Sequence, residues 1–179
     1  MNEERDRMAN TGKPRTPRLP PRWFIRLAWL VHRGLYRVTG GRALWAARGD
    51  RWGAVHLTTL GRRTGRRHGV IVGYFEDGPN LVTMAMNGWG DGEPAWWLNL
   101  QAHPDVRVDL REGPRLVTGR AAHGEERERL WSRWREIDKN LDAYAARRSM
   151  ETAVVILEPR TGASDGTPIN SAQGNSVVN

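Results

Sequence analysis

The sequence predicts an α+β protein that is mainly β, a small and largely antiparallel barrel with helices on its outside. Six short runs rich in β-branched residues, separated by turn residues, are typical of strands. Few helices lie between these runs, whereas a doubly wound sheet alternates strand and helix throughout. The chain has 179 residues, which is the size of one domain that can bury its own hydrophobic core.

The two ends of the chain differ in composition from the middle. Residues 1–20 are polar, charged and rich in proline, and residues 161–179 hold mostly small polar side chains; both segments are predicted to be disordered or flexible. Residues 1–48 carry 11 basic and three acidic side chains, whereas residues 49–179 carry 17 of each. The body is therefore neutral, and we expect no specific binding of nucleic acid.

An N-terminal basic amphipathic helix is predicted within residues 21–48, with its regular part at 21–38. Two prolines favour its start and two glycines favour its end. Two interpretations stay open: a peripheral contact with an anionic membrane, or packing on the chain's own barrel. Four basic side chains share one face, opposite a broad apolar arc: Arg22, Arg26, Arg33 and Arg37.

Residues 49–160 form the predicted barrel domain. Its strands are expected at 55–60, 70–75, 81–86, 106–110, 115–120 and 152–157. The turn sequences at 77–80 and 111–114 contain the glycine and proline that tight turns favour. A short helix is expected at Ala95–Ala102, and a long helix from about Glu125 to Arg148, where apolar residues recur every three or four positions.

The turn between the first two predicted strands is unusually basic. Residues 61–67 contain four arginines, one threonine and two glycines. Glycine lets backbone N–H groups turn toward a ligand, and arginine offers forked donors to phosphate or carboxylate oxygens. The segment is either a binding site for a ligand with several negative charges or an ordinary charged hairpin loop. It lacks the spacing of a P-loop.

A second segment, residues 86–100, combines the end of a strand, a loop with three glycines and the start of a helix. Such a segment can present backbone donors to a ligand while aromatic rings wall the site. Trp96 and Trp97 are neighbours on the expected helix. We therefore expect one of them to line a cavity or an interface, rather than both to enter one core.

Several kinds of chemistry are excluded by what the sequence lacks. It has no cysteine, and its five histidines show no metal-binding spacing, so neither thiol chemistry nor a metal site is expected. No serine follows the G-x-S-x-G pattern, and no G-x-G-x-x-G follows a strand. A barrel without an acid–base constellation must take its reactivity from a cofactor.

These motifs resemble the deazaflavin-dependent nitroreductase family, the quinone and nitro reductases that use reduced coenzyme F420. The resemblance covers roughly residues 50–160 and implies a split β-barrel of the flavin-reductase, FMN-binding type with peripheral helices. The matching motifs are Leu57-Thr58-Thr59-Leu60-Gly61-Arg62-Arg63-Thr64-Gly65, Gly73-Tyr74-Phe75 with Asp77-Gly78, and Pro94-Ala95-Trp96-Trp97-Leu98-Asn99-Leu100 with Pro104.

The resemblance also implies a reaction and a set of site residues. The reaction is hydride transfer from reduced coenzyme F420 to a quinone, nitro or enone-type acceptor, with Tyr144 as the catalytic residue that contacts the acceptor. The basic turn would bind the phosphate and oligoglutamate tail of the coenzyme, and the strand-end loop and helix would hold its deazaflavin. The implied coenzyme-binding residues are Gly61, Arg62, Arg63, Thr64, Gly65, Ala85, Met86, Asn87, Gly88, Trp96 and Asn99.

Two alternatives to this reaction remain at the level of sequence. One is a non-catalytic carrier of coenzyme or lipid at the membrane, and the other is an FMN-dependent reductase on the same fold. A turn with four arginines favours a ligand with more charge than the single phosphate of FMN. We expect a cytoplasmic protein, with the peripheral membrane contact through residues 21–38 as an addition, and either a monomer or a homodimer.

Overall fold

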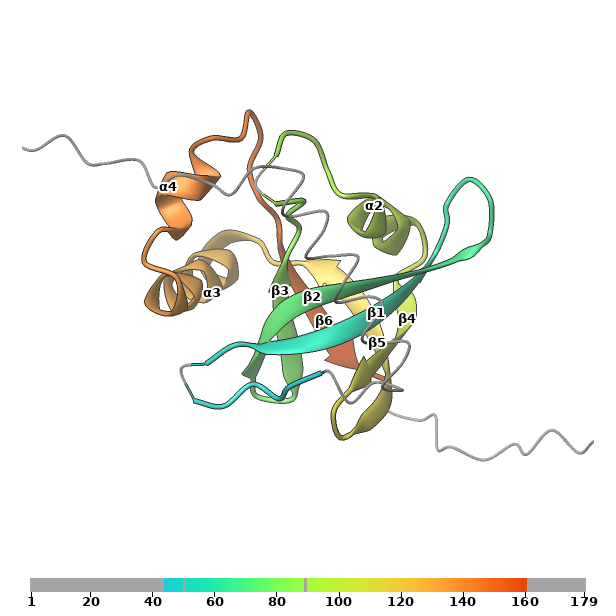
Figure 1. Cartoon of the computed structure of the whole chain (residues 1–179). Helices are drawn as coiled ribbons and strands as arrows, with labels where there is room; N and C mark the ends of the chain where they lie inside the picture. The colour runs from blue at the N-terminus through green and yellow to red at the C-terminus, as the bar shows by residue number, and fades with distance from the viewer. Residues whose placement is uncertain (1–43, 50, 89, 161–179) are drawn as a thin grey trace, which may run out of the picture.

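The computed structural model describes residues 44–49, 51–88 and 90–160 (Figure 1). The expectations for residues 1–20, 21–38 and 161–179 therefore lie outside the described residues. Within the described part of the chain, no helix is both long enough and apolar enough to cross a membrane.

Six antiparallel strands close into one barrel in the order β1-β2-β3-β6-β5-β4, which confirms the mainly β fold. The third strand ends at Met84, two residues earlier than expected, so Ala85 and Met86 belong to the loop that follows it. The last strand begins at Val154 rather than at residue 152. The strands are β1 (Gly53–Leu60), β2 (Arg67–Asp77), β3 (Asn80–Met84), β4 (Asp105–Leu110), β5 (Gly113–Ala121) and β6 (Val154–Pro159).

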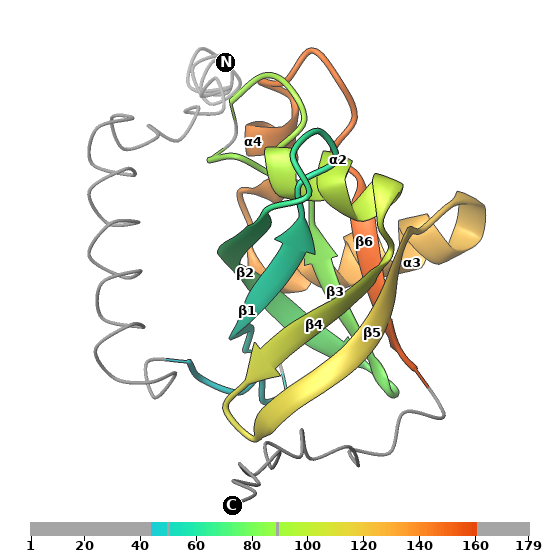
Figure 2. The same ribbon diagram turned by 90° about the vertical axis from the view of Figure 1, so that its right-hand side faces the viewer.

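The short helix α2 (Ala95–Ala102) has the predicted bounds and lies across one end of the barrel (Figure 2). The expectation of a single long helix from Glu125 to Arg148 is wrong. The chain instead forms α3 (Gly124–Ile137) and a short α4 (Leu141–Ala145). Asp138 leaves the helical conformation at φ −122° and ψ 101°, and its Oδ1 accepts a hydrogen bond from the backbone N–H of Asn140 at 2.9 Å. Such local bonding by aspartate competes with helix formation.

The interior of the barrel is closed at one end by α2. Val55 and Leu57 of β1 are fully buried in the same cluster as Trp96 and Trp97, which are 7% and 3% exposed. Both tryptophans therefore belong to one core, contrary to expectation, because α2 lies over the mouth of the barrel. The other part of the expectation is confirmed, because Trp96 also lines a cavity. Their rings meet edge to face, with centroids 6.3 Å apart.

A glycine on β5 allows α2 to approach the barrel this closely. A Cβ atom added at Gly119 would come within 2.5 Å of Cδ2 of Leu100, which is fully buried on α2. Any larger residue at this position would push the helix outward, because a buried leucine has little room to move. The position of α2 therefore depends on a residue in a strand far away in sequence.

A second core lies between the outside of the barrel and α3. Leu130 and Trp134 of α3 pack with Phe75 and Ile156 from the strands. The rings of Phe75 and Trp134 meet at 61° with centroids 5.0 Å apart, an edge-to-face contact that favours one helix position.

Residues 44–48, the described part of the predicted 21–48 helical region, are not helical. Leu44 is 3% exposed, and the backbone N–H of Ala47 donates to the hydroxyl of Tyr74 at 3.3 Å. The backbone N–H of Ala54 donates to the carbonyl of Trp45 at 2.9 Å. This segment is therefore attached to the barrel as non-helical chain.

Ion pairs attach α3 to the barrel at two points. Arg129 donates to both carboxylate oxygens of Asp77 at 2.8 Å, and Arg120 bonds both Glu126 and Glu158. The hydrogen bonds from Arg129 lower the pKa of Asp77, and those from Arg120 lower the pKa of Glu126. Both carboxylates are thus more acidic in the folded protein than in the unfolded chain.

We predict that Asp77→Asn removes part of the acid sensitivity of folding. A pKa lowered by folding gives stability above the unfolded pKa, about 4 for aspartate, and that stability is lost as the pH falls through the folded-state pKa. The variant should lose about 0.5–1 kcal/mol of unfolding free energy at neutral pH, because Arg129 is solvent-exposed, and this deficit should shrink as the pH falls through the folded-state pKa of Asp77. Urea unfolding at neutral and at acidic pH measures the deficit under the two conditions. Glu112→Gln, in an exposed turn, is the control and should change the unfolding free energy at neutral pH by less than about 0.5 kcal/mol.

Candidate functional site

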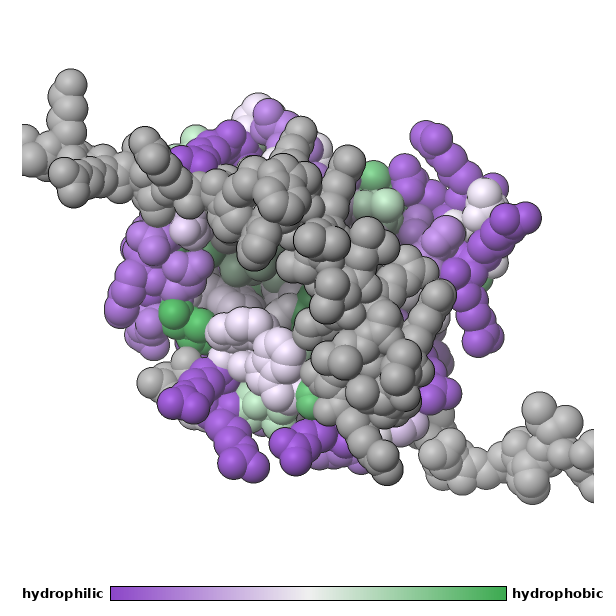
Figure 3. Space-filling view, in the orientation of Figure 1, coloured by the Kyte–Doolittle hydropathy of each residue, from purple (hydrophilic) through white to green (hydrophobic). Residues whose placement is uncertain are grey.

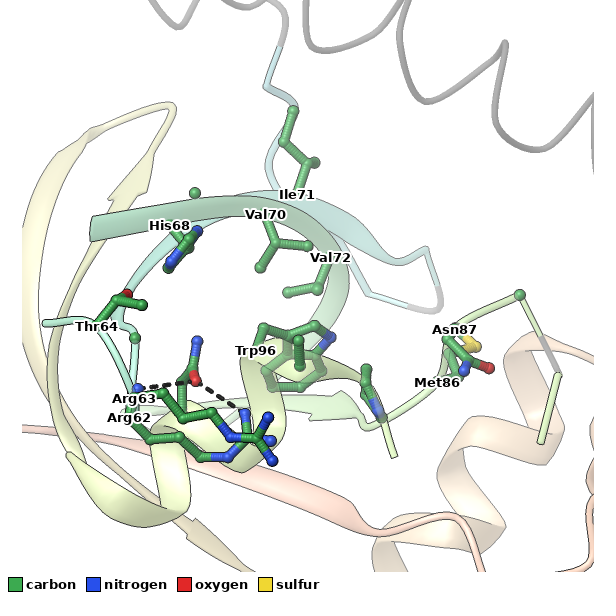
Figure 4. Close-up of a pocket in the computed structure, with 16 residues that line it drawn as sticks. Arg62, Arg63, Thr64, His68, Val70, Ile71, Val72, Met86, Asn87 and Trp96 are labelled. Atoms are coloured by element: carbon green, nitrogen blue, oxygen red, sulfur yellow. Dashed lines mark hydrogen bonds between the residues drawn. The ribbon is translucent and has the colours of Figure 1, made fainter. Parts of the chain in front are cut away.

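The two strands of the hairpin formed by β2 and β3 are unequal in length, so part of β2 has no described partner on the side of β3. Phe75–Asp77 pair with Asn80–Val82, whereas the described pairings of residues 67–74 are with β1. The first half of β2 therefore borders a cavity of about 720 Å³ (Figure 4).

Three segments that are distant in sequence meet around this cavity. They are the basic turn with the start of β2, the loop that follows β3, and the first turns of α2. The lining residues are Gly61, Arg62, Arg63, Thr64, His68, Gly69, Val70, Ile71, Val72, Met86, Asn87, Gly88, Pro94, Ala95, Trp96 and Asn99. Most of the residues that the sequence indicated are thus brought together, and those that do not line the cavity are Gly65, Ala85 and Tyr144.

The basic turn is closed by its own backbone. The N–H of Gly61 donates to the carbonyl of Arg66 at 2.8 Å, and the N–H of Gly65 donates to the carbonyl of Gly61 at 2.7 Å. Gly65 has φ +64°, a conformation that favours glycine, so it shapes the turn without bordering the cavity. Figure 3 shows hydrophilic side chains projecting from the body of the protein where this turn lies in Figure 1.

A buried amide on α2 holds the turn from below. Oδ1 of Asn99 accepts hydrogen bonds from the backbone N–H and from Nη1 of Arg62, at 3.2 and 3.3 Å. Nδ2 of Asn99 donates to Oγ1 of Thr59 at 3.4 Å, and that hydroxyl donates to the carbonyl of His68 at 3.3 Å. Asn99 is 5% exposed, so this network joins the helix, the turn and two strands from inside.

The middle of the cavity is apolar. Val70 and Val72 point toward Trp96 across the cavity, whereas Ile71 points away from them (Figure 4). Alternation along a strand produces this pattern, because successive side chains lie on opposite faces. The middle of the cavity therefore has apolar surface on two opposite sides.

The loop after β3 forms the far end of the cavity. Nδ2 of Asn87 donates to the carbonyls of Asp91 and Gly92 at 3.2 and 3.3 Å, which ties the loop to itself. Gly88 has φ +70°, so the loop turns there in a conformation that glycine adopts easily. Ala85 is fully buried and its N–H donates to Ala153 at 2.9 Å, so it anchors the loop instead of lining the cavity.

The charge around the cavity is positive at one end. Arg62 and Arg63 line it at the basic turn, and the lining residues include no aspartate or glutamate. Arg66 and Arg67 belong to the same turn and are exposed, but they do not line the cavity. An anionic group is therefore attracted to one end only, and the apolar middle lies next to it.

Tyr144 lies on α4 and is half-buried. Its proposed catalytic role stays a prediction, because it is not among the cavity-lining residues. In the described part of the chain, His, Asp and Glu side chains form no cluster of three that could hold a metal ion.

The sequence did not indicate the cavity-lining residues that β2 provides, which are His68 and the run from Gly69 to Val72. It also did not single out Pro94 and Ala95, which line the cavity at the start of α2. A signal for the part that β2 provides was present in the turn at 77–80. Pairing Asp77 with Asn80 fixes the register, so Gly73 falls opposite Met84, the last residue of β3. Residues of β2 before Gly73 then extend past the end of β3.

We predict that Asn99→Leu destabilises the protein and loosens the basic turn. The substitution keeps the branched shape and the number of heavy atoms but leaves the N–H of Arg62 and the hydroxyl of Thr59 without this partner, at a cost of about 1–3 kcal/mol. Urea unfolding measures the loss. Gln101→Ala, at an exposed position of the same helix, is the matched control and should change the unfolding free energy by less than about 0.5 kcal/mol. Equal stabilities of the two variants would contradict the role given to Asn99.

Comparison with known proteins shows the family to which the chain is similar. A family model described as F420H(2)-dependent quinone reductase matches residues 31–159. An F420H(2)-dependent quinone reductase of Mycobacterium tuberculosis is 30% identical over 135 residues, which cover 73% of this chain and 89% of that protein.

Two solved structures share the fold. An F420-H2 dependent reductase is 27% identical, with a TM-score of 0.53, over 59% of this chain and 93% of its own. A protein described as a domain-swapped dimer is 24% identical, with a TM-score of 0.55, over 74% of this chain and 99% of its own, and shows the fold alone. The model match and the M. tuberculosis relative decide the assignment: this chain belongs to the F420H(2)-dependent quinone reductase family.

Proposed function

We propose that this chain transfers a hydride from reduced coenzyme F420 to a small-molecule acceptor of the quinone type, and that the cavity beside β2 binds the coenzyme. One observation carries the proposal: a single cavity joins an arginine turn at one end to an apolar, tryptophan-lined middle. Membership of the F420H(2)-dependent quinone reductase family supports an enzyme rather than a carrier, and coenzyme F420 rather than FMN.

The described residues fit the two chemical parts of this coenzyme. Its phosphate and glutamate carboxylates match the forked donors of Arg62 and Arg63 at the basic end. Its flat heterocycle matches the apolar space between Val70, Val72 and Trp96. A volume of about 720 Å³ is within the range usual for cofactor sites.

When bound in its reduced form, coenzyme F420 supplies the hydride, that is, both electrons of the reduction. The protein's part is to hold the two reacting groups at roughly 3–3.5 Å and to exclude water from between them. Trp96 and the valines of β2 provide the dry surface. We propose that the backbone N–H groups of Asn87 and Gly88, two residues that line the cavity, stabilise negative charge on the heterocycle.

Tyr144 is proposed as the group that acts on the acceptor. Reduction of a quinone by hydride leaves an oxygen that must gain a proton, and the Tyr144 hydroxyl is a donor of the right kind. Its helix, α4, is followed directly by the segment that bonds the loop after β3, since the N–H of Ser149 donates to Oδ1 of Asp91 at 2.8 Å. Tyr144 is thus carried by chain that is attached to one end of the cavity.

We predict that Arg62→Ala and Arg63→Ala each weaken binding of coenzyme F420, by about 1.5–3 kcal/mol for each charged hydrogen bond that is lost. Fluorescence titration of the purified protein with the coenzyme measures the dissociation constant. Arg66→Ala and Arg67→Ala are matched controls, because they remove the same charge from the same turn without touching the cavity. Unfolding midpoints of all four variants separate weaker binding from weaker folding.

The controls also decide between a specific site and a general attraction. If all four variants weaken binding equally, the turn attracts anions only by its net charge. If none weakens it, the coenzyme binds elsewhere and the proposed site is wrong.

We predict that Tyr144→Phe lowers the turnover of a soluble quinone such as menadione by about 10²–10⁴-fold if its hydroxyl delivers the proton. The dissociation constant of the coenzyme should stay unchanged, because Tyr144 does not line the coenzyme cavity. Oxidation of the reduced coenzyme, followed by absorbance, measures the rate. An unchanged rate at saturating quinone excludes Tyr144 as the proton donor.

We further propose that a cytoplasmic enzyme touches an anionic membrane through residues 21–38, a segment outside the described residues. The support is the sequence pattern alone, four arginines opposite an apolar arc. Replacing Arg22, Arg26, Arg33 and Arg37 by glutamine should abolish sedimentation with anionic vesicles and leave coenzyme affinity intact. Vesicle binding that survives in this variant contradicts the proposal.

Light scattering during size-exclusion chromatography distinguishes the monomer from the homodimer.

A further inference from the structure

Arg148, in the segment between α4 and β6, is a buried cation outside the cavity. It is 7% exposed and does not line the cavity. Its Nη1 donates to the carbonyl of Ala85 at 3.1 Å and to Oγ1 of Thr152 at 2.6 Å, and its Nη2 donates to the carbonyl of Gly92 at 2.9 Å. All three of these acceptors are uncharged oxygens.

The two carbonyls are the ends of one loop. Ala85 follows β3 and Gly92 precedes the start of α2 by three residues, so residues 86–91 form the loop between them. One guanidinium therefore brings both ends of the loop to the same place. The loop and the segment that carries Arg148 lie side by side in both ribbon views (Figures 1 and 2).

This loop carries the far end of the cavity, which is lined by Met86, Asn87 and Gly88. The neighbouring Ser149 adds a second attachment: its N–H and hydroxyl both donate to Oδ1 of Asp91, at 2.8 and 3.1 Å. The loop that carries the lining residues is thus held by Arg148 and Ser149, which do not line the cavity themselves.

A guanidinium suits this role better than other side chains. It stays charged at any physiological pH, and its planar fork can bond two carbonyls at once, whereas an ammonium acts as a single point charge. Burying a cation is costly unless its donors are bonded. Nη1 and Nη2 of Arg148 are bonded, whereas its buried Nε has no hydrogen-bond partner among the described residues. Moving either end of the loop would break such a bond, so the buried charge opposes displacement of the loop.

We propose that Arg148 is a positioning residue of the coenzyme site: by bonding the carbonyls of Ala85 and Gly92, it fixes the loop whose Met86, Asn87 and Gly88 border the cavity. This inference rests on the proposed function of the cavity. It assigns to Arg148 an effect on coenzyme binding and hydride transfer that acts only through the loop.

The experiment compares Arg148→Met with Arg120→Met in the full-length protein. Arg120 attaches α3 to the barrel through Glu126 and Glu158, so its loss weakens the fold at a place remote from the loop. Hydrogen exchange of the peptide covering residues 85–93, without coenzyme, reports on the loop itself. Fluorescence titration with coenzyme F420 and menadione reduction report on the site.

We expect faster exchange of the loop peptide in Arg148→Met only, and a coenzyme dissociation constant raised at least about tenfold. Hydride transfer at saturating coenzyme should fall about 10–100-fold, because small misplacements of reacting groups are costly. Arg148→Lys should give intermediate values for all three measurements. Arg120→Met should lower the unfolding midpoint and leave loop exchange and coenzyme affinity at wild-type values.

The outcomes separate this inference from the function on which it rests. Unchanged loop exchange in Arg148→Met overturns the inference whether or not the coenzyme binds. Faster exchange with unchanged coenzyme affinity overturns the positioning role. If the wild-type protein does not bind the coenzyme, the proposed function is wrong. Hydrogen exchange of the loop peptide still tests whether Arg148 holds the loop. If Arg148→Met does not fold, Thr152→Val, which removes one acceptor of Nη1, should show the same changes at smaller size.

Discussion

Asn99 is a polar side chain that α2 buries against the barrel, and a buried amide must find partners for its oxygen and its nitrogen. It finds them in Arg62 of the basic turn and in Thr59 of β1, so the position of the helix and the position of the arginines are one constraint. Gly119 supports the same constraint, because only a residue without a side chain lets Leu100 and the rest of α2 come this close. The charged end of the cavity is therefore held by packing as well as by its own backbone.

The cavity itself follows from a difference in strand length. The turn at 77–80 fixes the register of β2 against β3, and β3 ends at Met84, so the first half of β2 continues past its partner. On the side away from β1, the residues of that half then face α2 and the loop after β3, where β3 would otherwise continue. Apolar side chains that would face a core in a longer hairpin become the wall of a binding site.

Local signals in the sequence predicted the elements that local chemistry determines. The basic turn was recognised because its glycines and arginines lie within seven residues, and α2 because prolines flank it on both sides. Features that depend on distant contacts could not be recognised in this way. Both Trp96 and Trp97 are buried because the barrel mouth surrounds α2, and the break at Asp138 depends on a single side-chain bond that the apolar spacing does not reveal. Residues 44–48 likewise owe their non-helical path to contacts with Tyr74 and Ala54.

The two ends of the cavity are stabilised by different means, and this suggests a division of roles. Arg62 and Arg63 line the charged end, and Asn99 fixes their turn at its base by accepting bonds from the backbone N–H and from Nη1 of Arg62. The loop from Met86 to Asp91 is fixed internally by Asn87 and from behind by Arg148 and Ser149. Affinity needs only that charges come near one another, whereas hydride transfer needs two carbons within a few tenths of an ångström of one distance. On the proposed function, the heterocycle is therefore held beside the loop end, and the buried guanidinium lies where exact positioning is required.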